Sequence, residues 1–470
     1  MIGWATMLCL LLLWALMAVV SVHLLRSAGW GWRRPIEPWR GELRGFADVT
    51  LQLPLCNEQA VAERVMRAAA ALDWPRDRLQ IQVLDDSQDE TVAIVDRVAQ
   101  ELGAQGVPIE VLRRGERTGY KAGNLQHGLE RARGDYIVVL DADSEPSADF
   151  LRRVMAPLLA DERLGFVQAR WSFRNEKAGL LERVQALILD GLMVIEQPRR
   201  QALGQPLQFN GTAGVWRRSA LEAAGGWLGQ GPVSVTEDLD LSFRAELAGY
   251  PGCGLPEVAV QTELPSTMAA FRVQQRRWVR GGAEGLRRMA RRLLTGDLPA
   301  RERDAMLGHL ARHAVQPLIL SAALWLPLVQ LGEIQLPVAV PGVWPVLLVL
   351  LIVAVGAYYG AARRRLGRSA APAFALAPLV LLLSVGLSLA LTASFLSGLL
   401  DRRAGEFVRT PKGNDRARFD PLLAFEIGWG LLCIVSAALL ALRGEWLAAL
   451  GVGGVLGGGL CWVGIASLLR

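Results

Sequence analysis

The segment Ile137-Val138-Val139-Leu140-Asp141-Ala142-Asp143 is the most informative stretch of this 470-residue chain. Four consecutive apolar residues predict a short buried strand, and two aspartates follow it directly. Side chains two residues apart on an extended segment point to the same side, so both carboxylates can reach one point. Like charges this close are costly, and a hard divalent cation would relieve the repulsion. A nucleotide diphosphate would complete the coordination shell of such an ion.

The residues around this segment, 46–310, alternate short apolar runs with helical patterns. Runs such as 48–55 and 80–84 have the length of strands, whereas 59–72 and 121–133 have helical periodicity. This alternation predicts an α/β domain with a mostly parallel sheet and helices on its faces. Because functional loops in such folds follow the carboxyl ends of strands, we expect the functional site there.

The apolar residues, 52% of the chain, concentrate at its two ends. Residues 2–25 form a nearly unbroken apolar run, long enough to cross a hydrocarbon core of ~30 Å. Basic residues follow this run and none precedes it, so we interpret residues 1–27 as an uncleaved N-terminal transmembrane anchor. The positive-inside rule then makes the soluble domain, residues 46–300, cytoplasmic.

Apolar runs return in the last third of the chain, and residues 301–470 therefore predict an all-helical membrane region. We expect spans near 314–332, 341–362, 422–442 and 446–469. The run 370–400 lies between two Arg-rich linkers, 363–368 and 401–418. If both linkers are cytoplasmic, 370–400 must be an interfacial or re-entrant helix. Six full spans with one basic loop outside are the alternative.

Charge and cysteine content exclude several classes of protein. The net charge is +6, but the arginines cluster at the edges of apolar runs, where they set membrane orientation, and no nucleic-acid-binding module is visible. The five cysteines are scattered without a C-x-x-C pair, so neither a zinc site nor a disulfide framework is indicated. We therefore expect no nucleic-acid partner.

Two polar segments close the first two predicted strands. Leu53-Pro54-Leu55-Cys56-Asn57-Glu58 ends one strand and opens a helix, and Val83-Leu84-Asp85-Asp86-Ser87 places two carboxylates after another. Each has a simpler interpretation: Asn57 as a helix N-cap, and the two acids as a solvated turn.

Two further segments carry groups suited to transfer chemistry. In Thr236-Glu237-Asp238 a carboxylate could remove a proton from a hydroxyl, although acids in a first helical turn can also be simple capping. In Gln274-Gln275-Arg276-Arg277-Trp278, Arg277 could clamp phosphate oxygens and Trp278 offers a flat face for a sugar ring. Trp and Arg are also common at membrane interfaces.

The order of these motifs resembles the processive branch of glycosyltransferase family 2, which includes cellulose, hyaluronan and chitin synthases. Within that branch, the segment Glu263-Leu264-Pro265-Ser266-Thr267 resembles the glucomannan-synthase type. The resemblance covers about residues 48–290. Further on, Phe407-Val408-Arg409-Thr410-Pro411-Lys412 is similar to the cellulose-synthase gating loop F-x-V-T-x-K, with Arg409 where that pattern has Val.

This resemblance implies a GT-A fold, Rossmann-like with a mostly parallel sheet, and Mg²⁺ or Mn²⁺ as cofactor. It implies a catalytic base at Asp238; nucleotide-sugar binding by Asn57, Glu58, Asp86, Lys121, Asp141 and Arg277; metal binding by Asp141 and Asp143; acceptor binding by Gln274, Trp278 and Glu237; and a gating loop with Phe407, Thr410 and Lys412.

The function expected from the resemblance is inverting transfer of a hexose from a nucleotide sugar to a growing β-linked polysaccharide. UDP-glucose is the first choice of donor and GDP-mannose the second. The alternative is a glycolipid synthase acting on a membrane lipid such as ceramide or diacylglycerol. A non-enzymatic scaffold would explain the apolar runs but not five ordered motifs. We expect an integral protein of the bacterial inner membrane, in contact with membrane lipids and with its catalytic domain in the cytoplasm.

Overall fold

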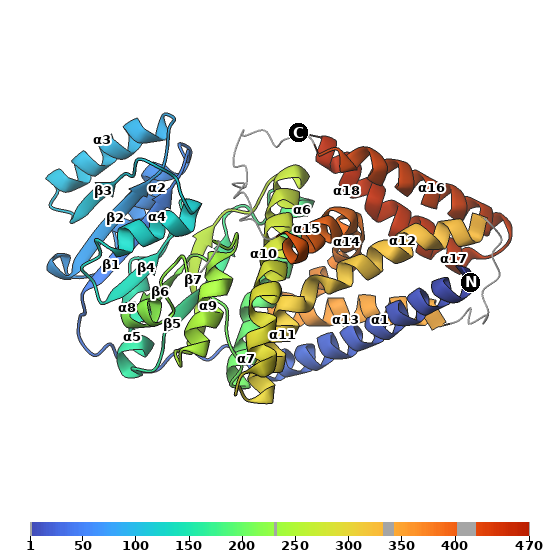
Figure 1. Ribbon diagram of the computed structural model, residues 1–470, viewed down its shortest axis with the longest axis horizontal. Coiled ribbons are helices and arrows are strands. Elements are labelled where there is room, and N and C mark those ends of the chain that lie inside the picture. The colour runs from blue at the N-terminus through green and yellow to red at the C-terminus, as the bar shows by residue number, and fades with distance from the viewer. Residues whose placement is uncertain (1, 230–232, 332–342, 402–419, 470) are drawn as a thin grey trace.

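The computed structural model describes residues 2–229, 233–331, 343–401 and 420–469. A seven-stranded sheet with its covering helices lies at one end of the molecule and helices alone lie at the other (Figure 1). Helix α10 (Met268–Thr295) runs along the boundary between these two parts (Figure 1). The chain therefore combines an α/β domain with an all-helical region, which confirms the predicted fold class.

The sheet is mostly parallel, as predicted. Its strands, in chain order, are β1 (Val49–Leu55), β2 (Leu79–Asp85), β3 (Ile109–Leu112), β4 (Tyr136–Val139), β5 (Phe166–Phe173), β6 (Gly214–Arg217) and β7 (Gly252–Thr262). Their spatial order is β3-β2-β1-β4-β6-β5-β7, and only β6 runs antiparallel to its neighbours. The carboxyl ends of β1, β2 and β4 therefore meet at one edge, where the polar motifs follow them.

Helices cover both faces of the sheet, because its strands are apolar on both sides. In β4, Val138 packs into one buried cluster while Ile137 and Val139 pack into the other. The helices of this domain are α2 (Ala62–Ala70), η1 (Arg76–Arg78), α3 (Thr91–Ala104), α4 (Tyr120–Leu129), α5 (Phe150–Ala160), α6 (Leu180–Gly191), η2 (Leu192–Glu196), α7 (Gln197–Ala202), α8 (Arg218–Ala223) and α9 (Glu237–Leu247). Such a double cover is what a near-continuous apolar strand requires.

Within the described residues, the all-helical part contains four helices long and apolar enough to cross a membrane, or five spans if one bent helix pair counts as a span. The four are Leu10–Arg33, Val343–Arg365, Leu422–Leu442 and Trp446–Leu468. The elements are α1 (Ile2–Arg33), α11 (Ala300–Ala311), η3 (Arg312–Ala314), α12 (Val315–Leu331), α13 (Val343–Arg365), α14 (Ala371–Gly386), α15 (Ser388–Leu400), α16 (Leu422–Leu442), α17 (Trp446–Ala449), η4 (Leu450–Gly457) and α18 (Gly458–Leu468).

The bounds of these helices differ from the predicted bounds in two places, and the run 370–400 stays a prediction. The first helix continues to Arg33, past the predicted end of the anchor at residue 27, because it packs along α13. The predicted span 314–332 corresponds to α12, which has 17 described residues and is not among the four long helices found there. The run 370–400 forms two helices that meet at a bend of 53°, a shape shared by broken spans and re-entrant loops.

Candidate active site

A cavity of about 350 Å³ lies between the carboxyl ends of the strands and helix α10. This volume falls within the roughly 300–1,000 Å³ that is usual for ligand sites. Ten predicted site residues line it, namely Glu58, Asp86, Lys121, Asp141, Asp143, Glu237, Asp238, Gln274, Arg277 and Trp278. The structure thus brings together motifs separated by more than 200 positions in the sequence. Phe407, Thr410 and Lys412, and the predicted gating loop around them, lie outside the described residues.

Asn57 does not line this cavity, although we predicted it with the nucleotide-binding residues. Its backbone is left-handed, with φ of 55°, a conformation that asparagine tolerates better than most residues. Its Oδ1 accepts a hydrogen bond from the backbone N–H of Gln88 at 2.9 Å, and its own N–H donates to Ser87 Oγ at 2.9 Å. Helix α2 begins only at Ala62, so Asn57 is not its N-cap. The residue ties together the loops that follow β1 and β2.

The two acids after β2 have different partners. Asp86 forms a two-pronged ion pair with Arg114, whose Nε and Nη2 lie 2.9 and 2.7 Å from its carboxylate oxygens. Arg114 also donates to the carbonyl oxygens of Thr118 and Tyr120 and so fixes the loop before α4. Asp85 is buried and bound instead to Arg113 at 2.9 Å. The acids are therefore not a solvated turn.

The sequence analysis did not single out Arg114. A signal was available, because Arg114 follows β3, the neighbour of β2 in the sheet, and so comes to the same edge as the two acids. Opposite charges at the ends of neighbouring parallel strands are expected to pair.

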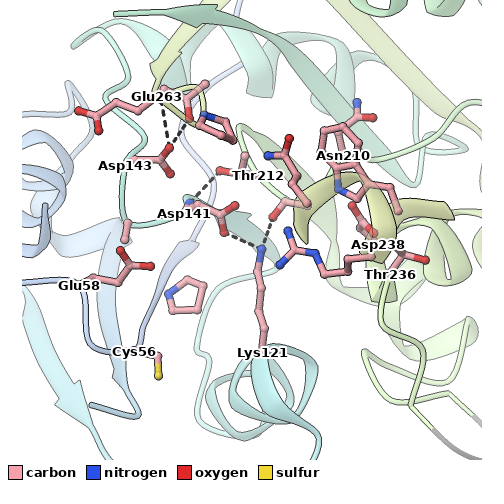
Figure 2. Close-up of a pocket in the computed structure, with 18 of the residues that line it drawn as sticks. Cys56, Glu58, Lys121, Asp141, Asp143, Asn210, Thr212, Thr236, Asp238 and Glu263 are labelled. Atoms are coloured by element: carbon pink, nitrogen blue, oxygen red, sulfur yellow. Dashed lines mark hydrogen bonds and ion pairs between the residues drawn. The ribbon is translucent and has the colours of Figure 1, made fainter. Parts of the chain in front are cut away.

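Asp141 and Asp143 lie in a turn and not on an extended segment, which corrects the reasoning that joined them. Strand β4 ends at Val139, and the N–H of Ser144 donates to the carbonyl oxygen of Asp141 at 2.9 Å. The two carboxylates still line one cavity, but from separate positions (Figure 2). Asp143 Oδ2 accepts hydrogen bonds from Thr262 Oγ1 at 2.7 Å and from the N–H of Glu263 at 3.1 Å.

Lys121 connects Asp141 to the segment before β6, and all three line the cavity (Figure 2). Its Nζ donates to Asp141 Oδ1 at 2.5 Å and to the carbonyl oxygen of Gly211 at 2.9 Å, and Glu237 lies 3.8 Å away. Burial alone would lower the pKa of Lys121, but the surrounding carboxylates of Asp141, Glu237 and Asp238 raise it. The lysine therefore remains a cation at the centre of the site.

A second segment that the sequence analysis missed is Asn210-Gly211-Thr212, which precedes β6 and lines the cavity. Thr212 Oγ1 accepts a hydrogen bond from the N–H of Asp141 at 2.8 Å. Gly211 has φ of +79°, a conformation that L side chains rarely adopt, and it directs its carbonyl oxygen at Lys121. A glycine between two polar residues before a strand was the only available signal.

Asp238 lies in the first turn of α9, facing the same cavity (Figure 2). Burial and the neighbouring carboxylate of Glu237 raise the pKa of Asp238 to about 7, against the opposing effect of Lys121. A carboxyl that titrates near neutral pH is well matched to accepting a proton from a hydroxyl. The N-cap residue Thr236 makes no side-chain capping hydrogen bond, so capping does not account for this segment.

Helix α10 supplies the wall opposite the strand ends. Gln274, Arg277 and Trp278 all line the cavity, so this Trp-Arg pair is not a membrane-interface belt. Burial lowers the pKa of Arg277, while the carboxylates of Glu237, Asp141 and Asp238 oppose that change. Trp278 packs against a small apolar cluster made of Ala186, Leu189 and Leu264.

Comparison with known protein families identifies the domain. Residues 47–281 match the family described as "Glycosyltransferase like family 2". The chain belongs to this family. The matched segment begins just before β1 and ends within α10, so it contains every residue of the cavity wall described above.

The family 2 domain also has close relatives among curated proteins. It is 42% identical over 251 residues to glucomannan 4-beta-mannosyltransferase 9 of Arabidopsis thaliana, covering 53% of this chain and 46% of the relative. It is 38% identical over 290 residues to a probable glucomannan 4-beta-mannosyltransferase 2 of Oryza sativa, covering 60% of this chain and 50% of the relative. The chain spans about half the length of these curated relatives.

A solved structure supports the GT-A-like fold of this family 2 domain. The mannosyltransferase PcManGT from Pyrobaculum calidifontis, solved in complex with GDP-Man and Mn²⁺, aligns with a TM-score of 0.54 at 19% sequence identity. The alignment covers 85% of this chain and 99% of that one. At this identity the similarity establishes the fold alone.

The donor set of the glycosyltransferase site fits a cation that arrives with a diphosphate. Asp141 and Asp143 place two carboxylates in one cavity. The described residues contain no group of three or more His, Cys, Asp or Glu that could hold a metal by themselves. Magnesium is commonly held by one or two carboxylates, with substrate phosphates and water completing the shell. Two acids are therefore sufficient when a nucleotide diphosphate is bound.

Proposed function

We propose that this protein is an inverting membrane glycosyltransferase that transfers a hexose from a nucleotide sugar to a growing β-linked polysaccharide. The observation that carries the proposal is the placement of Asp238, with a pKa of about 7, in the same cavity as the Lys121–Asp141 pair and Trp278. A proton acceptor, a charged diphosphate site and a flat apolar face are the three groups this reaction needs.

The proposed reaction is a single displacement. Asp238 accepts the proton of the acceptor hydroxyl while the hydroxyl oxygen forms a bond to the anomeric carbon of the donor. The bond between that carbon and the diphosphate oxygen breaks, and the nucleoside diphosphate leaves with the electron pair. One displacement inverts the anomeric configuration, so an α-linked donor gives a β-linked product.

Two cationic side chains would stabilise the departing diphosphate. Lys121 and Arg277 both lie among the carboxylates of the cavity. A bound diphosphate would interact with these two cations in place of some of those carboxylates. Asp141 and Asp143 would hold Mg²⁺ or Mn²⁺, which would supply further neutralisation of the diphosphate charge. Glu58 and Asp86 line the same cavity and form the proposed nucleotide end of the site.

The names of the relatives bear on the sugar. Proteins about 40% identical to this domain are named glucomannan 4-beta-mannosyltransferases, which favours a mannose donor and a β-1,4 product. We therefore place GDP-mannose ahead of UDP-glucose, which reverses the order expected from the sequence. Gln274, Trp278 and Glu237 are the proposed contacts of the acceptor chain.

Screening labelled nucleotide sugars with the purified, membrane-reconstituted protein tests this function. We expect GDP-mannose with Mn²⁺ or Mg²⁺ to give a product that a β-mannanase degrades, and Asp238→Asn to give none. Incorporation from UDP-glucose alone would overturn the choice of sugar. A single discrete product that partitions into organic solvent would favour the glycolipid alternative. Folded protein without transfer from any nucleotide sugar would overturn the function.

The proposed orientation places the glycosyltransferase domain on the cytoplasmic side, with α13 ending there at its arginines. A cysteine introduced at Arg365 should react with an impermeant thiol reagent only after the cells are permeabilised, whereas one at Glu445 should react in intact cells. The relatives named above come from plants, so the bacterial inner membrane stays a prediction from the sequence.

A further inference from the structure

Helix α10 has a second charged face, which the proposed chemistry does not use. Arg272, Arg276 and Arg280 follow one another at intervals of four residues, so they share one side of the helix. The cavity-lining residues Gln274 and Trp278 lie on a different side, since successive residues of an α-helix are about 100° apart. The three arginines therefore do not reach the substrate cavity.

The first of these arginines makes a fully buried ion pair with the membrane region. The guanidinium of Arg272 donates two hydrogen bonds of 2.8 Å to the carboxylate of Glu426, near the start of α16. Arg272 is 3% exposed and Glu426 is 0% exposed. The Nε of Arg272 also donates a hydrogen bond to the carboxylate of Asp420 at 2.9 Å. A charge inside an apolar span is costly without a partner, so this geometry strongly constrains where α10 lies against α16.

The other two arginines extend the contact along the helix. Arg276 reaches Asp420 at 2.9 Å and Ser394 of α15 at 3.3 Å. Arg280 reaches Asp401, at the end of α15, at 3.3 Å. Helix α15 packs along α10 (Figure 1). Together these pairs form what we call the arginine ladder: Arg272, Arg276 and Arg280 with Glu426, Asp420 and Asp401.

The end of the ladder also contacts the segment that precedes the proposed base. Arg280 Nε donates to Glu284 at 3.0 Å, and Glu284 in turn accepts a hydrogen bond from the N–H of Val235 at 3.4 Å. Thr236 follows Val235 directly, and Asp238 lies three residues after Val235. A Cβ added at Gly281 would collide with the side chain of Thr236, so α10 and the start of α9 are in close contact. Movement of α10 would therefore displace the cavity-lining residues of both α10 and the start of α9.

We propose that the arginine ladder positions α10, so that ion pairs to the membrane helices hold Gln274, Arg277 and Trp278 against the transfer site. The arginines are positioning residues and not catalytic ones. The effect on turnover rests on the proposed function, but the effect on the helix does not. A misplacement of about 1 Å in such a site can cost roughly 100-fold in rate.

Arg276→Gln in the full-length protein, reconstituted in lipid nanodiscs, is the first test. Arg276 is partly exposed, so the loss of one charge there should not prevent folding. Arg291→Gln is the matched control, because it removes the same charge from an exposed position of the same helix for which the described residues show no ion pair. We expect amide exchange in residues 273–282 to rise about tenfold in Arg276→Gln and to stay unchanged in Arg291→Gln.

Measurements of kcat and donor KM, and rescue by Arg276→Lys, distinguish a positioning role of Arg276 from a general effect on folding. We expect kcat per nucleotide-binding molecule to fall about tenfold in Arg276→Gln with less than a twofold change in donor KM. Glu58, Asp86 and Asp141 of the proposed donor site follow strands and do not lie on α10, and Arg277 of α10 acts mainly on the diphosphate as it departs. Arg276→Lys should recover most of the loss, since it restores a charge opposite Asp420. A fall in the number of binding-competent molecules at unchanged kcat would indicate a merely structural role and overturn the proposal.

A second variant tests the buried pair without leaving an unpaired charge. Arg272→Leu combined with Glu426→Leu removes both charges, a replacement that proteins often tolerate. We expect normal thermal stability but raised exchange in residues 273–282. Exchange equal to that of Arg291→Gln in both ladder variants would overturn the proposal, even if the wild type proves inactive as a transferase.

Discussion

The buried charges on the two sides of α10 differ in how far they are neutralised. Where α10 meets the membrane helices, Arg272 and Glu426 satisfy each other in a two-pronged pair. In the cavity on the other side of α10, Asp238 lies beside Glu237, and its pKa rises to about 7. One region neutralises its charges completely, whereas the other keeps a carboxyl poised between protonated and ionised forms.

This difference separates architecture from chemistry. A fully paired charge has no remaining capacity to bind a substrate, but it fixes the relative positions of two elements. A carboxyl with a neutral-range pKa is unfavourable for folding but can accept a proton during a reaction. Substitutions in the cavity should therefore remove activity and spare stability, while substitutions in the ladder should act through the position of α10.

The largest effect is expected from loss of the metal site. Asp143→Ala should abolish transfer, because a cation shared with the diphosphate would lose one of its two carboxylates. Chelation should silence the wild type, and added Mn²⁺ or Mg²⁺ should restore it. Radiolabel incorporation measures both. Full wild-type activity in excess chelator would leave Asp143 as a structural acceptor for Thr262 and Glu263.

Asp238→Asn should reduce transfer by about 100-fold or more, because the amide cannot accept the proton. It should not lower thermal stability. The folded-state pKa of Asp238 lies above the ordinary value of 3.8, so the ionised carboxyl costs folding free energy as the pH rises toward 7, and asparagine removes that cost. Melting temperature at pH 8 and turnover should be measured on the same preparation. Lower stability would contradict the contrast drawn between the two regions.

On the acidic limb of the pH profile, kcat/KM should change about tenfold per pH unit. Only ionised Asp238 accepts a proton, so kcat/KM should fall as the pH drops through about 7. Glu237→Gln removes a neighbouring negative charge that helps to raise this pKa, so the limb should move to lower pH. An unmoved limb in Glu237→Gln would assign the titration to another group.

The smallest effect on rate, and the clearest on product, is expected at Trp278. A ring face at the acceptor wall can hold successive sugars by stacking. Trp278→Ala should shorten the products several-fold more than it slows donor turnover, and Trp278→Phe should fall between the two. Product length against turnover at saturating donor is the measurement. Unchanged product length at reduced turnover would show that Trp278 does not help to bind the growing polymer.

Sequence alone determined the fold class, and ten residues that it predicted for the site line one cavity. The apolar runs at 137–140 and 48–55 specify strands buried on both faces, and in a mostly parallel sheet the polar residues that follow such strands meet at one edge. Asp86, Asp141 and Asp143 could therefore be assigned to one cavity without coordinates. Their placement follows from strand direction and periodicity, which are local properties of the chain.

Tertiary structure decided which partner each charge has. Pairs such as Asp86 with Arg114, Lys121 with the carbonyl oxygen of Gly211, and Arg272 with Glu426 join residues 28, 90 and 154 positions apart. Side-chain pairing at such separations depends on how loops and helices pack, and periodicity does not encode it. For the same reason, the sequence predicted that one face of α10 contacts the substrate through Trp278. It did not predict the other face, whose arginines pair with acids of the membrane region.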